Sequence, residues 1–412
     1  MNNTIKDGPL TIPASTAGGS VHIHAWTKKL DSNGNTVLNI EDAALKQAYE
    51  ASQLPCVFHH VSLMADSHVG YGVNIGCVLP LKDAICPNAV GVDIACGLAA
   101  INTGILVKDV NVDFVMQNIA KMVPHGNDKR KVGDVVHSYS NASFEFGTLF
   151  DTLADVDSRR ELCETQLGTL GGGNHFLSME KDETGNLWFM VHSGSRGFGA
   201  KIADHYHKLA VSMCEKWHTK LPNTDLAFLP TSTDEGREYI HWQKVATEYA
   251  FLNRKMMLEV ALMCLHGQMS PPDLTGMINI HHNYAALENH FGHNVWVHRK
   301  GATLARKGTV GIIPGSMCTK SYIVTGLGNP QSFDSCSHGA GRNFSRTEAK
   351  KRVAAGLDPS QEVQLGSVKL YGVTEAHDEL GSAYKNLDEV MINQKDLVQI
   401  TTELTPVATL KG

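Results

Sequence analysis

The feature that most constrains the fold is a set of five segments, four of them rich in glycine, that each carry histidine, cysteine or aspartate. In chain order they are GVDIACG at 91–97, GNHF at 173–176, VHSGSRG at 191–197, HHN at 281–283 and SHGAGR at 337–342. Glycine lets the backbone approach a ligand closely and adopt positive φ at little cost. Because the segments lie so far apart in the chain, only a tertiary fold can bring them together. The sequence therefore predicts one site assembled from five segments.

The alternative is that each histidine is an ordinary core or surface residue. For any one of the 21 histidines taken alone, that alternative is the better one. The joint occurrence of the glycine-rich segments reverses the odds. The histidines outside these segments are expected to be structural or exposed, including His22, His24, His59, His60, His205, His207 and His241.

Composition indicates a soluble globular protein, with 42% hydrophobic and 19% charged residues among 412. No internal repeat or linker is visible, so we expect a single domain over residues 1–412. No signal peptide and no apolar run of membrane-spanning length is found, which predicts a cytoplasmic protein that does not bind membranes. Nine cysteines without paired C-x-x-C spacing favour a reducing compartment.

The order of the predicted elements favours an α+β fold, with mixed β-sheets packed between helices, because no βαβ rhythm is present. Helices are expected at 41–54, 113–123, 199–218 and 240–266, and strands at 56–63, 73–80, 98–105, 276–282, 294–299, 309–314 and 321–326. Strand-like runs at 174–180 and 187–192, joined by TGN at 184–186, predict a hairpin. A capping box at 345–348 predicts the start of another helix.

The candidate ligands could hold two divalent metals if a thiolate bridges them. Asp93, Cys96, His175, His192 and His282 offer one oxygen, one sulfur and three nitrogens. This set leaves Mn, Zn and Fe open. Two metals ~3.5–4 Å apart stabilise the attacking and leaving oxygens in phosphoryl transfer, so phosphate chemistry is favoured over acyl transfer. The glycine loop at 168–173 is either a phosphate-facing loop or a plain turn.

Charge does not identify a nucleic-acid partner by itself. The net charge of −6 argues against a protein coated with basic residues, although a local basic channel stays possible. Basic clusters occur at 129–131, at 298–300 with 306–307, and at 350–352. Such runs are typical of solvated surface as well as of phosphate contacts. The middle cluster is expected near the site, because Gly301 and Gly308 interleave it.

Nine motifs in the same order resemble the RtcB family of RNA ligases. The motifs are D-x-H-x-G at 66–70, GVDI-x-CG at 91–97, GNHF at 173–176, HSGSRG at 192–197, HNY at 282–284, RKGA at 299–302, IIPGSM at 312–317, SHGAGR at 337–342 and KG at 411–412. The match runs from about residue 50 to the end of the sequence. It implies an RtcB-like catalytic domain.

The resemblance implies a ligase that uses GTP and two Mn²⁺ per chain, in RNA repair or tRNA splicing. It would join RNA ending in a 3′-phosphate or 2′,3′-cyclic phosphate to RNA bearing a 5′-hydroxyl. His338 would attack the α-phosphorus of GTP and form a histidine-GMP intermediate. The GMP would pass to the 3′-phosphate, and the 5′-hydroxyl would then displace it. The oligomeric state is left open, with a monomer as the expectation.

The resemblance also implies residue roles. Cys96 would bridge the metals, with Asp93 and His175 on one and His192 and His282 on the other. The nucleotide would be bound by Asn174, His175, Phe176, Leu177, Ser178, His282, Asn283, Pro314, Gly315, Ser316, Met317, Ser321, His338, Gly339, Ala340, Gly341 and Lys411.

Ser178 departs from the family pattern, in which a glutamate that meets the guanine edge is expected at this position. A serine supplies one hydroxyl in place of a charged acceptor. We therefore expect GTP to be preferred over ATP by a smaller margin, unless Glu180 or another nearby acid takes over. Ala65 before Asp66 and Ala95 before Cys96 also replace residues that are commoner in the family, and ligation chemistry is expected to survive these two small changes.

Two other functions are compatible with the same residues. A binuclear metallophosphoesterase acting on RNA ends would use water as the nucleophile, would need no nucleotide, and would make His338 another metal ligand. A non-catalytic protein that binds RNA ends would have lost the nucleophile or the bridging thiol. Both His338 and Cys96 are present.

Overall fold

The computed structural model describes residues 5–131, 157–267, 272–317, 319–357, 368–372 and 378–412. It confirms the α+β class, with two large, mostly antiparallel sheets. Among the described residues, parallel pairing is confined to β2 (His22–Ala25) with β5 (His60–His68), and to β19 (Lys369–Gly372) with β20 (Val398–Lys411). Within the described part of the chain, no helix is both long and apolar enough to cross a membrane.

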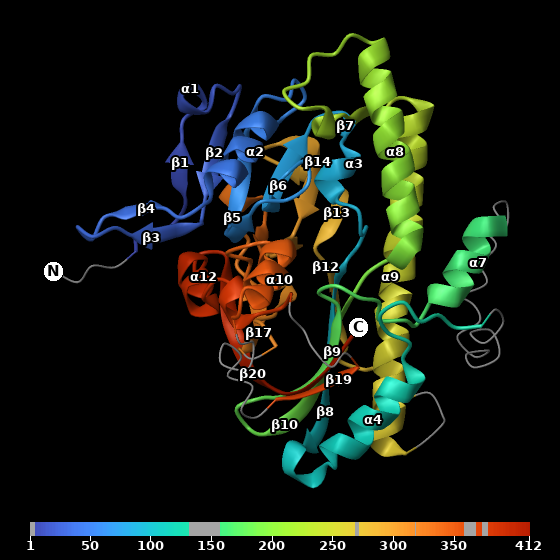
Figure 1. Ribbon diagram of the computed structural model, residues 1–412. Helices are drawn as coiled ribbons and strands as arrows, with labels where there is room; N and C mark the ends of the chain where they lie inside the picture. The colour runs from blue at the N-terminus through green and yellow to red at the C-terminus, as the bar shows by residue number, and fades with distance from the viewer. Residues whose placement is uncertain (1–4, 132–156, 268–271, 318, 358–367, 373–377) are drawn as a thin grey trace.

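The larger sheet carries most of the glycine-rich segments. Its strand order is β12 (Ile278–His281), β8 (Gly97–Leu106), β10 (Asn186–Ser193), β9 (Phe176–Lys181), β20, β17 (Ser321–Gly326) and β16 (Val310–Ile313), with β19 beside β20. The predicted hairpin is confirmed, since β9 pairs antiparallel with β10 and Phe176 faces His192. The long strand β20 was not predicted. It lies between β9 and β17 and brings the end of the chain to the centre of the molecule (Figure 1).

The second sheet has the order β1 (Leu10–Ile12), β2, β5, β6 (Ile75–Leu81), β14 (His293–Lys300) and β13 (Asn283–His290). The expected strand at 56–63 was wrong in its bounds. Cys56 lies in a turn and His59 has a φ of 59°, so the strand begins only at His60 and continues to His68. Two-stranded pairs complete the β-structure: β3 (Lys28–Leu30) with β4 (Thr36–Leu38), β7 (Ala84–Ile85) with β11 (Leu229–Pro230), and β15 (Ala302–Leu304) with β18 (Ser335–Ser337).

The two longest helices, α8 (Arg196–Lys216) and α9 (Asp234–His266), lie side by side, and α9 packs on β8 and β10 (Figure 1). Helix α9 begins well before the expected residue 240, because the Thr233 side chain caps it by accepting from the Gly236 amide. The predicted capping box is confirmed, since Ser345 accepts from the Glu348 amide at the start of α10 (Arg346–Ala354). The other α-helices are α1 (Ala14–Ala17), α2 (Asp42–Ser52), α3 (Pro87–Val90), α4 (Val112–Met122), α7 (Asp157–Gln166) and α12 (Leu387–Asn393).

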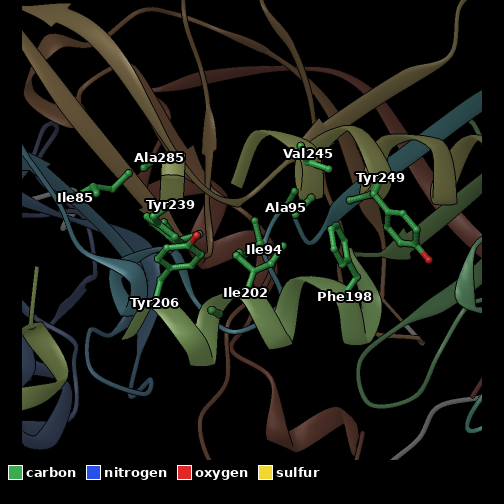
Figure 2. Packing of buried hydrophobic residues seen from close by; sticks show 14 of the residues in the cluster. Ile85, Ile94, Ala95, Phe198, Ile202, Tyr206, Tyr239, Val245, Tyr249 and Ala285 are labelled. Carbon is green, nitrogen blue, oxygen red and sulfur yellow. The ribbon is translucent and has the colours of Figure 1, made fainter. Parts of the chain in front are cut away.

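The core between α8 and α9 fixes the segment that carries Asp93 and Cys96. Phe198 and Ile202 of α8 pack with aromatic residues of α9, and Ile94 and Ala95 fill the same cluster (Figure 2). Both Ile94 and Ala95 are fully buried. Burying one isoleucine side chain stabilises a fold by about 1.5–3 kcal/mol. The loop is thus anchored between its two candidate ligands.

Candidate active site

Five candidate ligands from three of the glycine-rich segments and the segment around His282 converge into one cluster. Asp93, Cys96 and His175 form one group, and Cys96, His192 and His282 form the other. The Cys96 sulfur lies 3.5 Å from Nε2 of His175 and 3.3 Å from Nε2 of His192. Nε2 of His192 lies 3.1 Å from Nε2 of His282, and Nε2 of His175 lies 3.1 Å from Asp93 Oδ2. The two groups therefore share only the thiol.

Antiparallel pairing explains why these side chains meet. Cys96 and His175 stand immediately before β8 and β9, whereas His192 and His282 stand at the ends of β10 and β12. Gly97, the first residue of β8, pairs with both Ser193 and His281. In an antiparallel pair one strand begins where its neighbour ends, so all four ligands lie at the same end of these strands of the larger sheet.

Backbone and amide groups orient the imidazoles. Nδ1 of His175 lies 2.9 Å from the Leu170 carbonyl oxygen, and Nδ1 of His282 lies 3.2 Å from Oδ1 of Asn283. An Nδ1–H donated to these oxygens leaves the Nε2 lone pair facing the cluster. The 168–173 loop thus supports a ligand through Leu170, and none of its residues lines the cavity described below. These contacts favour its interpretation as a turn.

A buried arginine that the sequence did not single out joins the ligand segments. Nη1 of Arg254, on α9, donates to the carbonyl oxygens of Ala95 and Ser193, each at 2.9 Å. Its Nη2 lies 2.8 Å from Nδ1 of His281. Arg254 therefore holds three of the ligand-bearing segments in one arrangement. Nothing in its helical sequence context distinguishes it from an exposed arginine.

The donor set is chemically suited to divalent transition-metal ions, and Cys96 belongs to both ligand groups. Burial raises the pKa of the Cys96 thiol well above its usual range, and burial also lowers the pKa of His192 and His282. Burial works to raise the pKa of Asp93, but the hydrogen bond and charge interaction with His175, together with Arg196 and Cys96, outweigh it and the pKa is lowered. Neutral imidazoles and an ionised carboxylate are the forms that bind metals, and only the thiol must lose a proton.

His338 pairs with an aspartate that the sequence motif contained but to which no role was assigned. Asp66, in β5, is fully buried, and its Oδ2 lies 2.7 Å from Nδ1 of His338. The same oxygen accepts from the His338 backbone N–H at 3.1 Å. Burial works to raise the pKa of Asp66, but His338, together with His68 and Lys385, outweighs it and the pKa is lowered. With Nδ1–H donated to the carboxylate, Nε2 of His338 keeps its lone pair.

The turn after His338 requires glycine. Gly341 has a φ of 71°, and a Cβ at this position would lie 2.3 Å from the backbone oxygen of Asp66. Any side chain would push the turn away from β5 and separate His338 from its aspartate. The SHGAGR motif therefore encodes the pairing of these two residues as well as the histidine itself.

A cavity of about 800 Å³ joins the metal-type cluster to His338, and its size lies within the usual range for ligand sites. Its walls include Asp93, Cys96 and His192 of the cluster. Of the predicted nucleotide-binding residues, it is lined by Asn174, Phe176, His282, Asn283, Pro314, Gly315, Ser316, Met317, His338, Gly339, Ala340, Gly341 and Lys411. The predicted nucleotide site is thus largely brought together.

Four predicted nucleotide contacts lie outside this cavity. His175 is in the metal-type cluster, and Ser178 and Ser321 line a smaller recess beside the cavity. The Leu177 side chain is fully buried in the hydrophobic core between the sheet and α9. Because side chains alternate along a strand, Leu177 faces the core when its neighbours face the ligand side.

Cationic side chains line the cavity beside the cluster. Lys300 donates to the carbonyl oxygens of Tyr71 and Asn88, and burial lowers its pKa to about 8. Lys411 donates to the Gly173 carbonyl oxygen at 2.7 Å. Arg342 and Arg346 also line the cavity. Of the basic cluster at 298–300 and 306–307, which was predicted to lie near the site, only Lys300 lines the cavity. Arg299 is buried, and its Nη1 lies 2.6 Å from Oε1 of Glu288.

Comparison with known proteins agrees with this geometry. The model of the family described as tRNA-splicing ligase RtcB matches residues 47–412. The chain is 38% identical over 407 residues to the RNA-splicing ligase RtcB of Escherichia coli K12, covering 95% of this chain and 97% of that protein. It is 27% identical over 441 residues to the tRNA-splicing ligase RtcB of Thermococcus kodakarensis, covering 90% and 92%. With its cluster, its paired histidine and these relatives, the chain belongs to the RtcB family of RNA-splicing ligases.

Proposed function

We propose that this RNA ligase joins RNA 3′-phosphate or 2′,3′-cyclic phosphate ends to 5′-hydroxyl ends, using GTP and two Mn²⁺, through a GMP carried on His338. The proposal places it in the cytoplasm, as a monomer, in RNA repair or tRNA splicing. The observation that carries it is the Asp66–His338 pair, whose histidine lines the same cavity as the metal-type cluster.

The first step follows from the hydrogen bonds of His338. Nε2 attacks the α-phosphorus of GTP, a P–N bond forms, and the bond to pyrophosphate breaks. The ring becomes positively charged as it reacts, and the buried carboxylate of Asp66 stabilises that charge. Covalent catalysis divides the difficult activation of a 3′-phosphate into easier steps. Asp66 therefore acts as the positioning residue for the nucleophile.

The cluster and the cations would handle the phosphate charge. Mn²⁺ ions, held by Asp93, Cys96 and His175 on one side and by Cys96, His192 and His282 on the other, would neutralise and polarise phosphate oxygens. Lys300, Arg346 and Lys411 line the same cavity and suit the polyphosphate of GTP. Their carbonyl contacts keep the two lysine ammonium groups in place before substrate binds.

Two further transfers complete the reaction. An oxygen of the RNA 3′-phosphate attacks the phosphorus of the His338-bound GMP, the P–N bond breaks, and His338 is regenerated. The 5′-hydroxyl then attacks the activated 3′-phosphate, loses its proton, and expels GMP as a phosphodiester forms. A cyclic phosphate is first opened by hydrolysis.

The geometry supports this proposal over a metallophosphoesterase. In that alternative His338 would be a metal ligand through Nε2, and its Nδ1 contact with Asp66 is compatible with either role. Neither three-residue ligand group found among the described residues includes His338. A histidine that lines the cavity outside both ligand groups suits a nucleophile better than a ligand.

The test is covalent labelling with GTP carrying ³²P at the α-phosphate, in the presence of Mn²⁺. We expect a label on the protein that is labile in acid and stable in alkali, as a phosphoramidate is. His338→Ala should carry no label, whereas His205→Ala, an exposed histidine on α8, should label normally. Label retained in His338→Ala would overturn the assignment. Release of phosphate from RNA 3′-ends without nucleotide would favour the phosphoesterase.

A further inference from the structure

A small recess adjoins the large cavity and ends at a buried acid. The two share Phe176, Gly315, Ser316 and Met317. The recess holds about 20 Å³ of free space, so it admits the edge of a ring and not a whole ring. Its remaining lining is Ser178, Glu180, Ser321, Pro406 and Thr409. A ligand in the large cavity could therefore present one edge to this recess.

Only one of the two carboxyl oxygens of Glu180 has hydrogen-bond partners among the described residues. Glu180 lies on β9 and is only 2% exposed. Its Oε1 accepts from Oγ of Ser178 at 2.8 Å and from Oγ of Ser321 at 3.5 Å. Its Oε2 is buried and has no hydrogen-bond partner among the described residues. Leaving a buried polar atom unpaired costs about 1–3 kcal/mol or more, so this oxygen is matched to a donor that arrives with a ligand.

The state of this carboxyl group is consistent with that role. Burial raises the pKa of Glu180 to about 7, and the hydroxyls of Ser178 and Ser321 only partly offset the effect. A ligand that donates hydrogen bonds stabilises the ionised form. No charged side chain contributes to this shift. Glu180 is therefore a buried acceptor that a neutral donor edge can satisfy.

We propose that Glu180 recognises the base of the nucleotide by accepting hydrogen bonds from N1–H and the exocyclic amine of guanine. This inference rests on the proposed use of a nucleotide. Guanine places two adjacent donors on one edge, which matches one carboxylate. Adenine places an acceptor, N1, beside its amine. Uracil offers one donor between two carbonyl oxygens, and cytosine offers an acceptor beside its amine.

Ser178 then acts as the positioning residue for Glu180. Both side chains point to the same face of β9, because they are two residues apart. The Ser178 hydroxyl donates to Oε1 and so leaves Oε2 for the ligand. Serine at 178 is thus compatible with guanine selectivity, because the acid stands two residues further along the same strand.

The test measures equilibrium binding of GTP, ITP and ATP by calorimetry in the presence of Mn²⁺, in a His338→Ala background that cannot form the covalent bond, together with labelling of the His338 protein by each nucleotide. ITP keeps N1–H but lacks the exocyclic amine. Protein with Glu180 intact should bind ITP about tenfold and ATP about a hundredfold more weakly than GTP. Glu180→Gln should lower the ratio of GTP affinity to ATP affinity by at least about tenfold, because an amide can both donate to N1 and accept from the amine of adenine.

Two further variants separate recognition from folding. Ser178→Ala should lower the ratio of GTP affinity to ATP affinity about threefold to tenfold and leave the ATP affinity unchanged. A general loss of structure would instead weaken the binding of both nucleotides. Glu183→Gln, an exposed acid at the turn of the same hairpin, should leave the ratio unchanged.

The outcomes distinguish this inference from the proposed function. Guanine-selective binding that depends on Glu180, without covalent label, would overturn the ligase mechanism and keep the role of Glu180. Label that forms equally fast from GTP, ITP and ATP would overturn the role of Glu180 and keep the mechanism. An unchanged GTP-to-ATP ratio in folded Glu180→Gln would also overturn it, and binding of none of the three nucleotides would overturn both.

Discussion

Replacing Asp66 by asparagine isolates the contribution of one buried charge to the reactivity of His338. The same oxygen, Oδ2, accepts from both Nδ1 and the backbone N–H of His338, at 2.7 and 3.1 Å. Asparagine can place its oxygen there and satisfy both donors. It can instead rotate its amide, which would donate to Nδ1 and move the proton to Nε2, destroying the nucleophile.

The energies of the two rotamers decide the expected result. The rotated amide would set an NH₂ group against the backbone N–H of His338 and leave a buried donor unpaired, at about 1–3 kcal/mol. The unrotated form avoids this donor–donor contact and should dominate, although its NH₂ group takes the place of Oδ1, which is buried without a hydrogen-bond partner among the described residues. The unrotated form keeps the reactive tautomer. Its loss of the charge in one hydrogen bond is worth about 1.5–3 kcal/mol, or roughly ten- to a hundredfold in rate. A serine protease in which the equivalent change selects the wrong tautomer loses about 10⁴.

The assay is single-turnover labelling of His338 at saturating GTP and Mn²⁺. Asp66→Asn should label roughly ten- to a hundredfold more slowly than wild type. Asp66→Ala should be slower still, because it removes both acceptor contacts. Asp204→Asn, an exposed residue on α8, serves as the control. Wild-type labelling by Asp66→Asn, or Asp66→Ala labelling as fast as Asp66→Asn, would refute the role of the pair.

Three other predictions concern the cluster and its surroundings. Cys96→Ser should lower occupancy of both metal positions and Asp93→Ala mainly one, as metal analysis of purified protein will reveal; two tightly held ions in Cys96→Ala would contradict the bridging role. Arg254→Met should lower the free energy of unfolding by about 3 kcal/mol or more, because it leaves buried carbonyl oxygens unpaired, and an unchanged melting temperature would argue against it. Burial raises the pKa of Glu180 to about 7, so between about pH 4.5 and about pH 7 the folded protein keeps a proton that the unfolded chain has lost. This proton contributes fully to stability below about pH 4.5, and its contribution is lost as pH rises through about 7. Wild type should therefore lose up to about 3 kcal/mol relative to Glu180→Gln between about pH 5 and about pH 8, and parallel stability curves would contradict the burial of an acid there.

The sequence predicted those parts of the fold that have local signals. The TGN turn predicts the β9–β10 hairpin, and the capping box of Ser345 and Glu348 predicts the start of α10. The sequence of β20 carries no local signal of this kind. Pro406 interrupts the strand at a register shift, and the partner strands β9 and β17 lie far away in the chain. Strand β13 was also missed, since it follows β12 across one residue but belongs to the other sheet.

The candidate site was predictable in its ligands and not in its supports. Glycine-flanked ligands mark themselves, and the resemblance adds their grouping around Cys96, which the distances match. Asp66 and His338 are 272 residues apart, and no periodicity joins them. Arg254 and Glu180 depend on burial, which composition alone cannot reveal. The weaker purine discrimination expected from Ser178 was conditional on Glu180, and the contacts of Glu180 favour its taking over that role.

The position of β20 has a consequence for the order in which the protein matures on the ribosome. β20 separates β9 from β17, yet it is synthesised after both. A nascent chain that already contains all five metal-type side chains and His338 still has a sheet divided in two, and it lacks Lys411. Pairing across such long sequence separations is slow to form. Translation that stops before β20 would therefore leave β9 and β17 without their shared neighbour and the cavity without Lys411.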